Sequence, residues 1–162
     1  VGSGGGLPGV VIDRFGEAEL IQLTDPDAQA AVQTARVQLK LDDAQALADG
    51  YLGRVFALPL AGCAKPVGVG AVEYVPPPQL TRIVCDVARY YLYDDLAPEA
   101  EVYRRFKNAS AELQAIADGK AVLGCPWGGT PGEPAGAGPV AGETLYDFAP
   151  RAIGGDVSGG YR

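Results

Sequence analysis

The densest cluster of side chains that could do chemistry lies between positions 86 and 95, where charged residues alternate with tyrosines. Its members are Asp86, Arg89, Tyr90, Tyr91, Tyr93, Asp94 and Asp95. The adjacent carboxylates of Asp94 and Asp95 could hold a divalent cation or exchange a proton with a substrate. Neighbouring residues on a helix diverge by about 100 degrees, however, so these two side chains share one ligand poorly. We therefore expect Asp86 to pair with Arg89 one turn away. Asp94 and Asp95 are expected to mark the helix end or to contact another subunit.

The chain contains no histidine. This removes the commonest general base, the commonest metal ligand and every Ser-His or Cys-His pair. The Gly119-Lys120 pair lacks the upstream glycine of a phosphate-binding loop. We expect a protein that is not an enzyme, with no catalytic residue, metal ligand or cofactor. A small metal-dependent enzyme that uses Asp94 and Asp95 is the alternative.

The formal net charge of −7 argues against a nucleic-acid grip, which needs clustered cations to displace counterions from phosphates. It argues equally against binding to an anionic membrane surface. No apolar run approaches the roughly 20 residues that a membrane-spanning helix needs. Since the acidic residues are dispersed, we expect them mainly to promote solubility.

The three cysteines, Cys63, Cys85 and Cys125, cannot all pair within one chain, and their spacing is not typical of a metal site. Cys85 falls within an apolar helical pattern. We expect buried or incidental thiols in a reducing compartment.

Three segments carry the apolar periodicity of amphipathic helices. The first has apolar or aromatic residues at spacings of three and four from Val37 to Val55, and the second runs from Leu80 to Leu92. The third is expected to open at Pro98 and to end at Gly119. Ahead of them, two short helical turns broken at Gly16 are predicted. Asp25-Pro26 is expected to begin the next helix.

Glycine and proline divide the remaining chain. Residues 1–9 are predicted to be a flexible leader, 10–123 a helical domain, and 59–78 an irregular loop within it that is a candidate contact surface. Val67, Val69 and Val72 could form a small extended piece or hairpin in that loop. The predicted fold is all-α: a compact bundle of three to five helices with a long irregular loop and an extended C-terminal arm.

The expected arm covers residues 124–162, which are too rich in glycine and proline to bury much apolar surface. Aromatic residues nevertheless occur at intervals within this arm. Trp127, Tyr146 and Phe148 are interpreted as anchors with which the arm orders on a partner. A disordered end without a role is the alternative interpretation.

Three strings resemble a protein family of Mu-like phages and prophages. They are Asp13-Arg14-Phe15-Gly16-Glu17-Ala18-Glu19-Leu20-Ile21-Gln22-Leu23-Thr24-Asp25, then Leu58-Pro59-Leu60, and then Asp86-Val87-Ala88-Arg89-Tyr90-Tyr91-Leu92-Tyr93-Asp94-Asp95 followed by Ala97-Pro98-Glu99. Their order and spacing fit that family over about residues 10–123. That family is similar to the head–tail connector, or adaptor, proteins of tailed phages. The glycine-rich leader and the long glycine-rich tail depart from the pattern.

The resemblance implies a structural virion protein, made in the host cytoplasm and located in the neck between head and tail. Such a subunit joins a ring, typically of twelve copies, between the portal protein and the next neck or tail protein, and it lets DNA pass without specific binding. Asp86, Arg89, Tyr90, Tyr93 and Asp94 become candidate interface residues, together with Trp127, Tyr146 and Phe148. The alternatives are another neck or tail-completion protein and a helical interaction module outside the virion.

Overall fold

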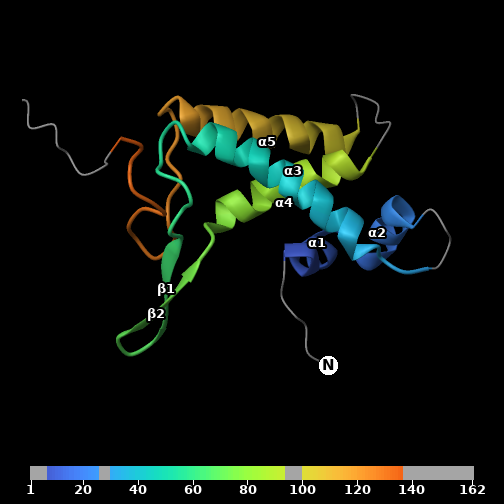
Figure 1. The fold of residues 1–162 in the computed structure, drawn as a ribbon, viewed down its shortest axis with the longest axis horizontal. Helices are drawn as coiled ribbons and strands as arrows, with labels where there is room; N and C mark the ends of the chain where they lie inside the picture. The colour runs from blue at the N-terminus through green and yellow to red at the C-terminus, as the bar shows by residue number, and fades with distance from the viewer. Residues whose placement is uncertain (1–6, 26–29, 94–99, 137–162) are drawn as a thin grey trace, which may run out of the picture.

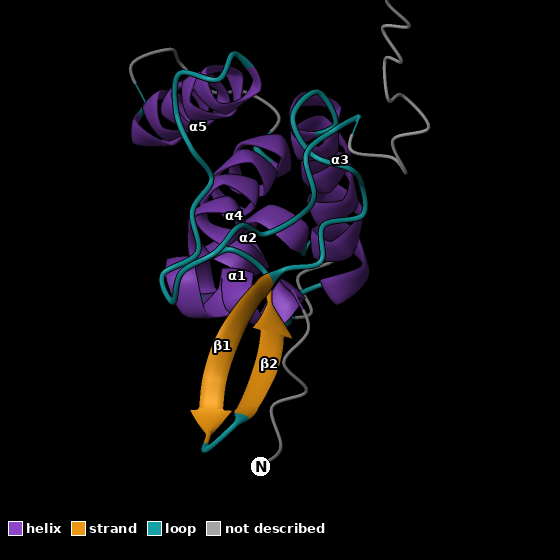
Figure 2. Cartoon of the chain, turned by 90° about the vertical axis from the view of Figure 1, so that its left-hand side faces the viewer, coloured by secondary structure: helices purple, strands orange, loops and turns teal. Residues whose placement is uncertain are grey.

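The computed structural model describes residues 7–25, 30–93 and 100–136, and within them three long helices form the centre of the fold (Figure 1). These are α3 (Thr34–Leu52), α4 (Pro78–Leu92) and α5 (Glu101–Ala117). Helix α4 lies between the other two and contacts both (Figure 2). The three amphipathic segments predicted from the sequence are therefore helices that pack on one another.

The central position of α4 explains why its apolar face is the broadest. Eight of its fifteen residues are buried, including Ile83, Val87 and Ala88, which are inaccessible to solvent. Burying an aliphatic side chain of the size of Ile83 or Val87 contributes about 1.5–3 kcal/mol. Pro78 occupies the first turn, where its missing N–H costs nothing.

Helices α3 and α5 present narrower stripes to α4, as the spacing of their apolar residues predicts. The buried members are Val37, Leu41, Ala44, Ala48 and Leu52 of α3 and Val102, Ala109, Leu113 and Ile116 of α5. Helix α5 ends before Gly119, whose φ of 71° suits the left-handed turn after a helix. Pro98, at which this helix was expected to open, lies outside the described residues.

Two short helices, α1 (Leu7–Phe15) and α2 (Glu17–Thr24), cover one end of the bundle. Gly16 separates them with a φ of 90°, a conformation that residues with a Cβ rarely adopt. The predicted break at Gly16 is thus confirmed, while α1 begins earlier than the expected domain start at residue 10. Asp25 lies at the C-terminal end of α2, where a boundary was expected. Pro26, at which the next helix was expected to open, lies outside the described residues.

The all-α prediction was also wrong, because an antiparallel hairpin interrupts the helices. Strands β1 (Cys63–Gly68) and β2 (Ala71–Val75) pair from Cys63 opposite Val75 to Gly68 opposite Ala71. Alternating β-branched and aromatic residues favour strands here. Pro66 is tolerated because each strand of a two-stranded sheet is an edge, and Gly70, with φ of 72°, makes the turn. The extended piece suggested for the irregular loop is this hairpin, which projects from the helices (Figure 2).

Residues 121–136 return to the base of the hairpin after α5. Cys63 of β1 and Cys125 form a disulfide with their Cα atoms 5.4 Å apart, so the expectation that both are thiols was wrong. The N–H of Gly62 donates to the carbonyl of Pro131 at 2.8 Å, and the N–H of Ala57 donates to that of Glu133 at 2.8 Å. The described part of the expected arm is therefore bound to the domain. Cys85, by contrast, is a buried free thiol, and burial raises its pKa.

Candidate functional site

The last turns of α4, where the sequence concentrates its charged and aromatic residues, bind α1 and α2. The guanidinium of Arg89 donates to both carboxylate oxygens of Glu19, at 2.7 and 2.8 Å, and the hydroxyl of Tyr93 donates to the same carboxylate at 2.8 Å. The Arg89 guanidinium also stacks on the Phe15 ring, 4.5 Å from its centroid. We call Glu19, Arg89 and Tyr93 the clamp, because together they hold the two short helices against the end of α4.

The clamp alters the acidity of its members. Burial disfavours the charge of Arg89, but the hydrogen bonds and the negative charge of Glu19 outweigh it and raise the pKa of Arg89 further. Desolvation and the hydrogen bond to Glu19 likewise raise the pKa of the Tyr93 hydroxyl. Both groups therefore keep their protons, which suits fixed hydrogen-bond donors rather than proton-transfer catalysts.

The helical spacing predicted an ion pair between Asp86 and Arg89, but the structure does not contain it. Each of the two side chains pairs with other residues instead. The Asp86 carboxylate, 6% exposed, lies 3.6 Å from a guanidinium nitrogen of Arg82 and 3.4 Å from one of Arg105 on α5. Arg82 also donates to Glu112 of α5 at 2.6 Å. Asp86 thus belongs to a charged network between α4 and α5.

Tyr90 extends the contact between α4 and α5 with its ring. It stacks on Phe106 with the ring centroids 4.1 Å apart, and it meets Tyr103 at 5.9 Å. Four of the predicted interface residues, Asp86, Arg89, Tyr90 and Tyr93, therefore make contacts within the chain. Asp94, and with it Asp95, lies outside the described residues.

A cation site is not found in the part of the chain that the structure describes. No group of three or more acidic, cysteine or histidine side chains there has the geometry to hold a metal ion. No described helix is both long enough and apolar enough to cross a membrane.

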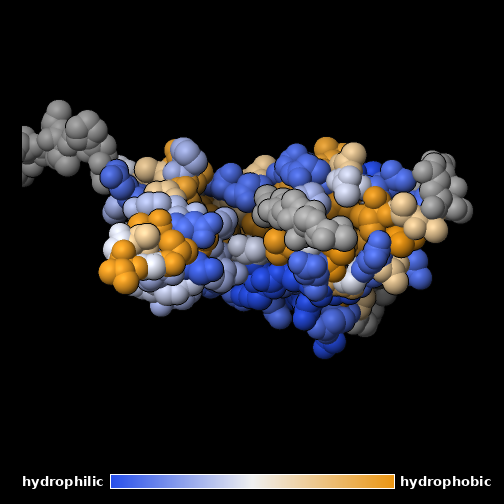
Figure 3. Space-filling view, turned by 90° about the horizontal axis from the view of Figure 1, so that it is seen from below, coloured by the Kyte–Doolittle hydropathy of each residue, from blue (hydrophilic) through white to orange (hydrophobic). Residues whose placement is uncertain are grey.

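The opposite end of the molecule is chemically different. We call residues 55–75 and 121–136 the hairpin end, because the hairpin, the loop before it and the segment after α5 lie together there. Seven of the large apolar side chains exposed in the described residues lie here: Leu58, Val67, Val69, Val72, Tyr74, Val122 and Trp127. Figure 3 shows hydrophobic atoms gathered over the hairpin at the left of the view. Exposed apolar groups gathered in one region are typical of an interaction surface.

The hairpin itself is exposed on nearly all of its side chains, with Tyr74 65% accessible and Val69 fully so. Lys65 and Glu73 occupy opposite positions in the register, which leaves the hairpin without net charge. It therefore offers apolar contacts and two free strand edges to a partner.

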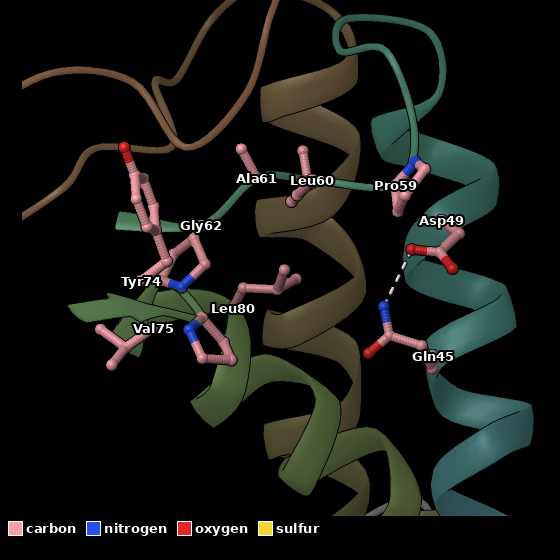
Figure 4. A pocket seen from close by; sticks show the side chains of 11 residues that line it. Gln45, Asp49, Pro59, Leu60, Ala61, Gly62, Tyr74, Val75 and Leu80 are labelled. Atoms are coloured by element: carbon pink, nitrogen blue, oxygen red, sulfur yellow. Dashed lines mark hydrogen bonds between the residues drawn. The ribbon is translucent and has the colours of Figure 1, made fainter. Parts of the chain in front are cut away.

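A pocket of about 380 Å³ lies where the hairpin joins the helices (Figure 4). Prolines 59, 76 and 77 line it together with Leu60, Tyr74 and Leu80, while Gln45 and Asp49 of α3 form the polar wall. The amide of Gln45 donates to the Asp49 carboxylate at 2.8 Å. The pocket therefore combines an apolar lining with one carboxylate.

Trp127 is the predicted arm residue that the structure describes. It lies in the segment that Cys125 ties to β1, and it is 42% exposed. Tyr146 and Phe148 lie outside the described residues. Neither Tyr74 nor Glu19 was predicted as a functional residue, although the alternation of Val72 and Tyr74 is a strand signal.

The chain is similar to a known protein family. Residues 10–141 match the family model described as "Bacteriophage Mu, Gp36". No curated protein matches the chain. The match includes the clamp and the whole hairpin end up to Gly136.

Proposed function

The chain belongs to the bacteriophage Mu Gp36 family, and from this premise we propose that it is a structural virion protein, the subunit of a head–tail connector. It forms a ring of twelve copies between the portal and the next neck or tail protein and extends the DNA channel. It is not an enzyme and needs no cofactor. Synthesis takes place in the host cytoplasm, and the protein then resides in the neck of the particle.

The observation that carries this proposal is the division of the surface into two ends. Exposed apolar side chains gather at the hairpin end, whereas the charged residues of the α4 helix are used within the chain. A ring closes through heterologous contacts, which need two unlike surfaces on one subunit. A protruding hairpin on one side of a helical domain provides such an asymmetry.

The negative charge of the chain supports the proposal that DNA passes through the ring without specific binding. The net charge of −7 gives phosphates little to bind, so DNA passes through the ring without specific contacts. Some of the acidic residues face the channel. Mapping them onto an assembled ring tests this point, and a basic or neutral channel wall would contradict it.

Substituting the hairpin tip in the phage tests the proposal directly. Val69→Asp should leave the subunit folded, since Val69 touches solvent only, but should yield heads and tails that do not join. Ala35→Asp is the matched control, because Ala35 is an exposed residue of α3 outside the hairpin end, and it should give normal particles. Joined particles in normal number from both variants would contradict the proposal.

Two further outcomes separate the alternatives. Mass spectrometry of purified particles should detect the chain, and its absence would favour an interaction module outside the virion. Electron cryomicroscopy should place its density against the portal, whereas density remote from the portal would favour another neck or tail-completion protein.

A further inference from the structure

Three shallow hollows follow one another along the outward face of α3. The first, about 390 Å³, is lined by Leu47, Gly50, Tyr51 and Arg54. The second, about 450 Å³, shares Ala46 with the first and has tyrosines of α4 as its far wall. The third, about 200 Å³, shares Lys40 and Tyr91 with the second. We call this continuous surface the α3 strip.

The described chain ends beside this strip. The N–H of Ala135 donates to the carbonyl of Val55 at 2.7 Å, and Pro134 forms a bridge with Phe56. Val55 directly follows Arg54, which lines the first hollow. Residues 137–162 therefore continue the chain from a point next to one end of the α3 strip.

The distance allows the continuing chain to reach any part of the strip. The nine residues that follow Gly136, up to Leu145, span up to about 30 Å when extended. The strip runs from Arg54 back to Arg36 along α3, which at 1.5 Å per helical residue is about 27 Å.

Composition identifies the segment that fits. The strip carries the cations Arg36, Lys40 and Arg54 among apolar and aromatic walls. Lys40 lies 3.8 Å from Asp43 and Arg54 lies 3.9 Å from Asp118, so the three cations exceed the two carboxylates by one positive charge. Residues 143–148 read Glu-Thr-Leu-Tyr-Asp-Phe, with two carboxylates among three large apolar side chains. A second copy's hairpin is a poorer occupant, because Lys65 and Glu73 leave it no net charge with which to complement the strip.

We propose that residues 143–148 bind the α3 strip of their own chain, with Leu145, Tyr146 and Phe148 in the hollows and Glu143 and Asp147 beside the cations. The strip is thus an internal receptor for the C-terminal segment. This inference does not depend on the connector role, since it concerns the free subunit.

Hydrogen exchange on the full-length chain tests the proposal. Amides of residues 143–148 should exchange at least about tenfold more slowly in the wild type than in Gly50→Gln, which fills the first hollow. A Cβ built at Gly50 meets no atom within 4 Å, and replacing a helical glycine favours the helix, so the variant should fold. Phe148→Ser should lose protection in the same way, while Ala35→Gln, an exposed substitution outside the strip, should keep it.

Three results of this experiment would contradict the proposal. Equal exchange of residues 143–148 in the wild type and in Gly50→Gln would show that the strip does not hold the segment. Loss of protection in the Ala35→Gln control would show that the effect is not local. Protection that weakens on tenfold dilution of the protein would show that the segment binds a second copy instead.

Discussion

The clamp and the hairpin end use tyrosine in opposite ways. At the clamp, Arg89 and Tyr93 direct their polar groups to one carboxylate and are partly buried. At the hairpin end, Tyr74 and the neighbouring valines remain in solvent. A conspicuous cluster of charged and aromatic residues in the sequence can therefore stabilise the fold, while a loop rich in proline and glycine provides exposed apolar surface.

The largest expected effect on stability comes from the disulfide that anchors the hairpin end. The Cys63→Ser, Cys125→Ser double variant opens a crosslink between residues 62 positions apart. Lost constraint on the unfolded chain should lower the free energy of unfolding by about 2–4 kcal/mol, measured by urea denaturation. Reducing agent should destabilise the wild type equally and should not affect the double variant. Equal urea midpoints for the oxidised and reduced wild type would contradict the prediction.

The next effect concerns the clamp. Arg89→Met removes two charge-assisted hydrogen bonds and leaves the Glu19 carboxylate, 22% exposed, without its cation. The free energy of unfolding should fall by roughly 2 kcal/mol. Arg104→Met is the matched control, because Arg104 is 66% exposed beside Glu101, and should cost less than about 0.5 kcal/mol. Similar losses in both variants would show that the clamp stabilises no more than a surface pair does.

A smaller change tests the tyrosine of the clamp and its pH dependence. Tyr93→Phe removes one hydrogen bond to Glu19 and should cost about 1 kcal/mol near neutral pH. Because the folded-state pKa of Tyr93 is raised, its contribution is complete below the unfolded pKa and is lost as pH rises through the folded value. The stability difference between wild type and variant should therefore shrink above about pH 10. A difference that stays constant from about pH 9 to 11 would contradict this linkage.

The smallest effect is expected at the hairpin end. Val72→Thr should change the free energy of unfolding by less than about 0.5 kcal/mol, because Val72 is 55% exposed. Val87→Thr in α4 is the matched comparison, since the same change buries a hydroxyl in the core and should cost about 1–3 kcal/mol. Chemical denaturation of both variants measures the contrast. A comparable loss at Val72 would show that the hairpin packs on the domain rather than projecting from it.

The helices could be predicted because their signals are local. Apolar residues at spacings of three and four mark α3, α4 and α5, and Gly16 marks a break through its own backbone freedom. The hairpin was less predictable, because two short strands containing Pro66 resemble a loop as closely as a sheet.

The partners of the charged residues could not be predicted from spacing. Arg89 does not bind Asp86, which lies one helical turn away. It binds Glu19, which lies 70 positions earlier in the chain. Cys63 likewise pairs with Cys125 rather than remaining a thiol. Both choices depend on where distant segments come to lie.

The positions of the long helices and their buried faces follow from the amino-acid sequence, because the period of a helix is a property of a few adjacent residues. The tertiary structure alone decided that Glu19 receives Arg89 and Tyr93, that Cys63 meets Cys125, and that the apolar residues of the hairpin stay exposed. Contacts of this kind depend on the relative positions of whole elements, and no spacing along the chain encodes those positions.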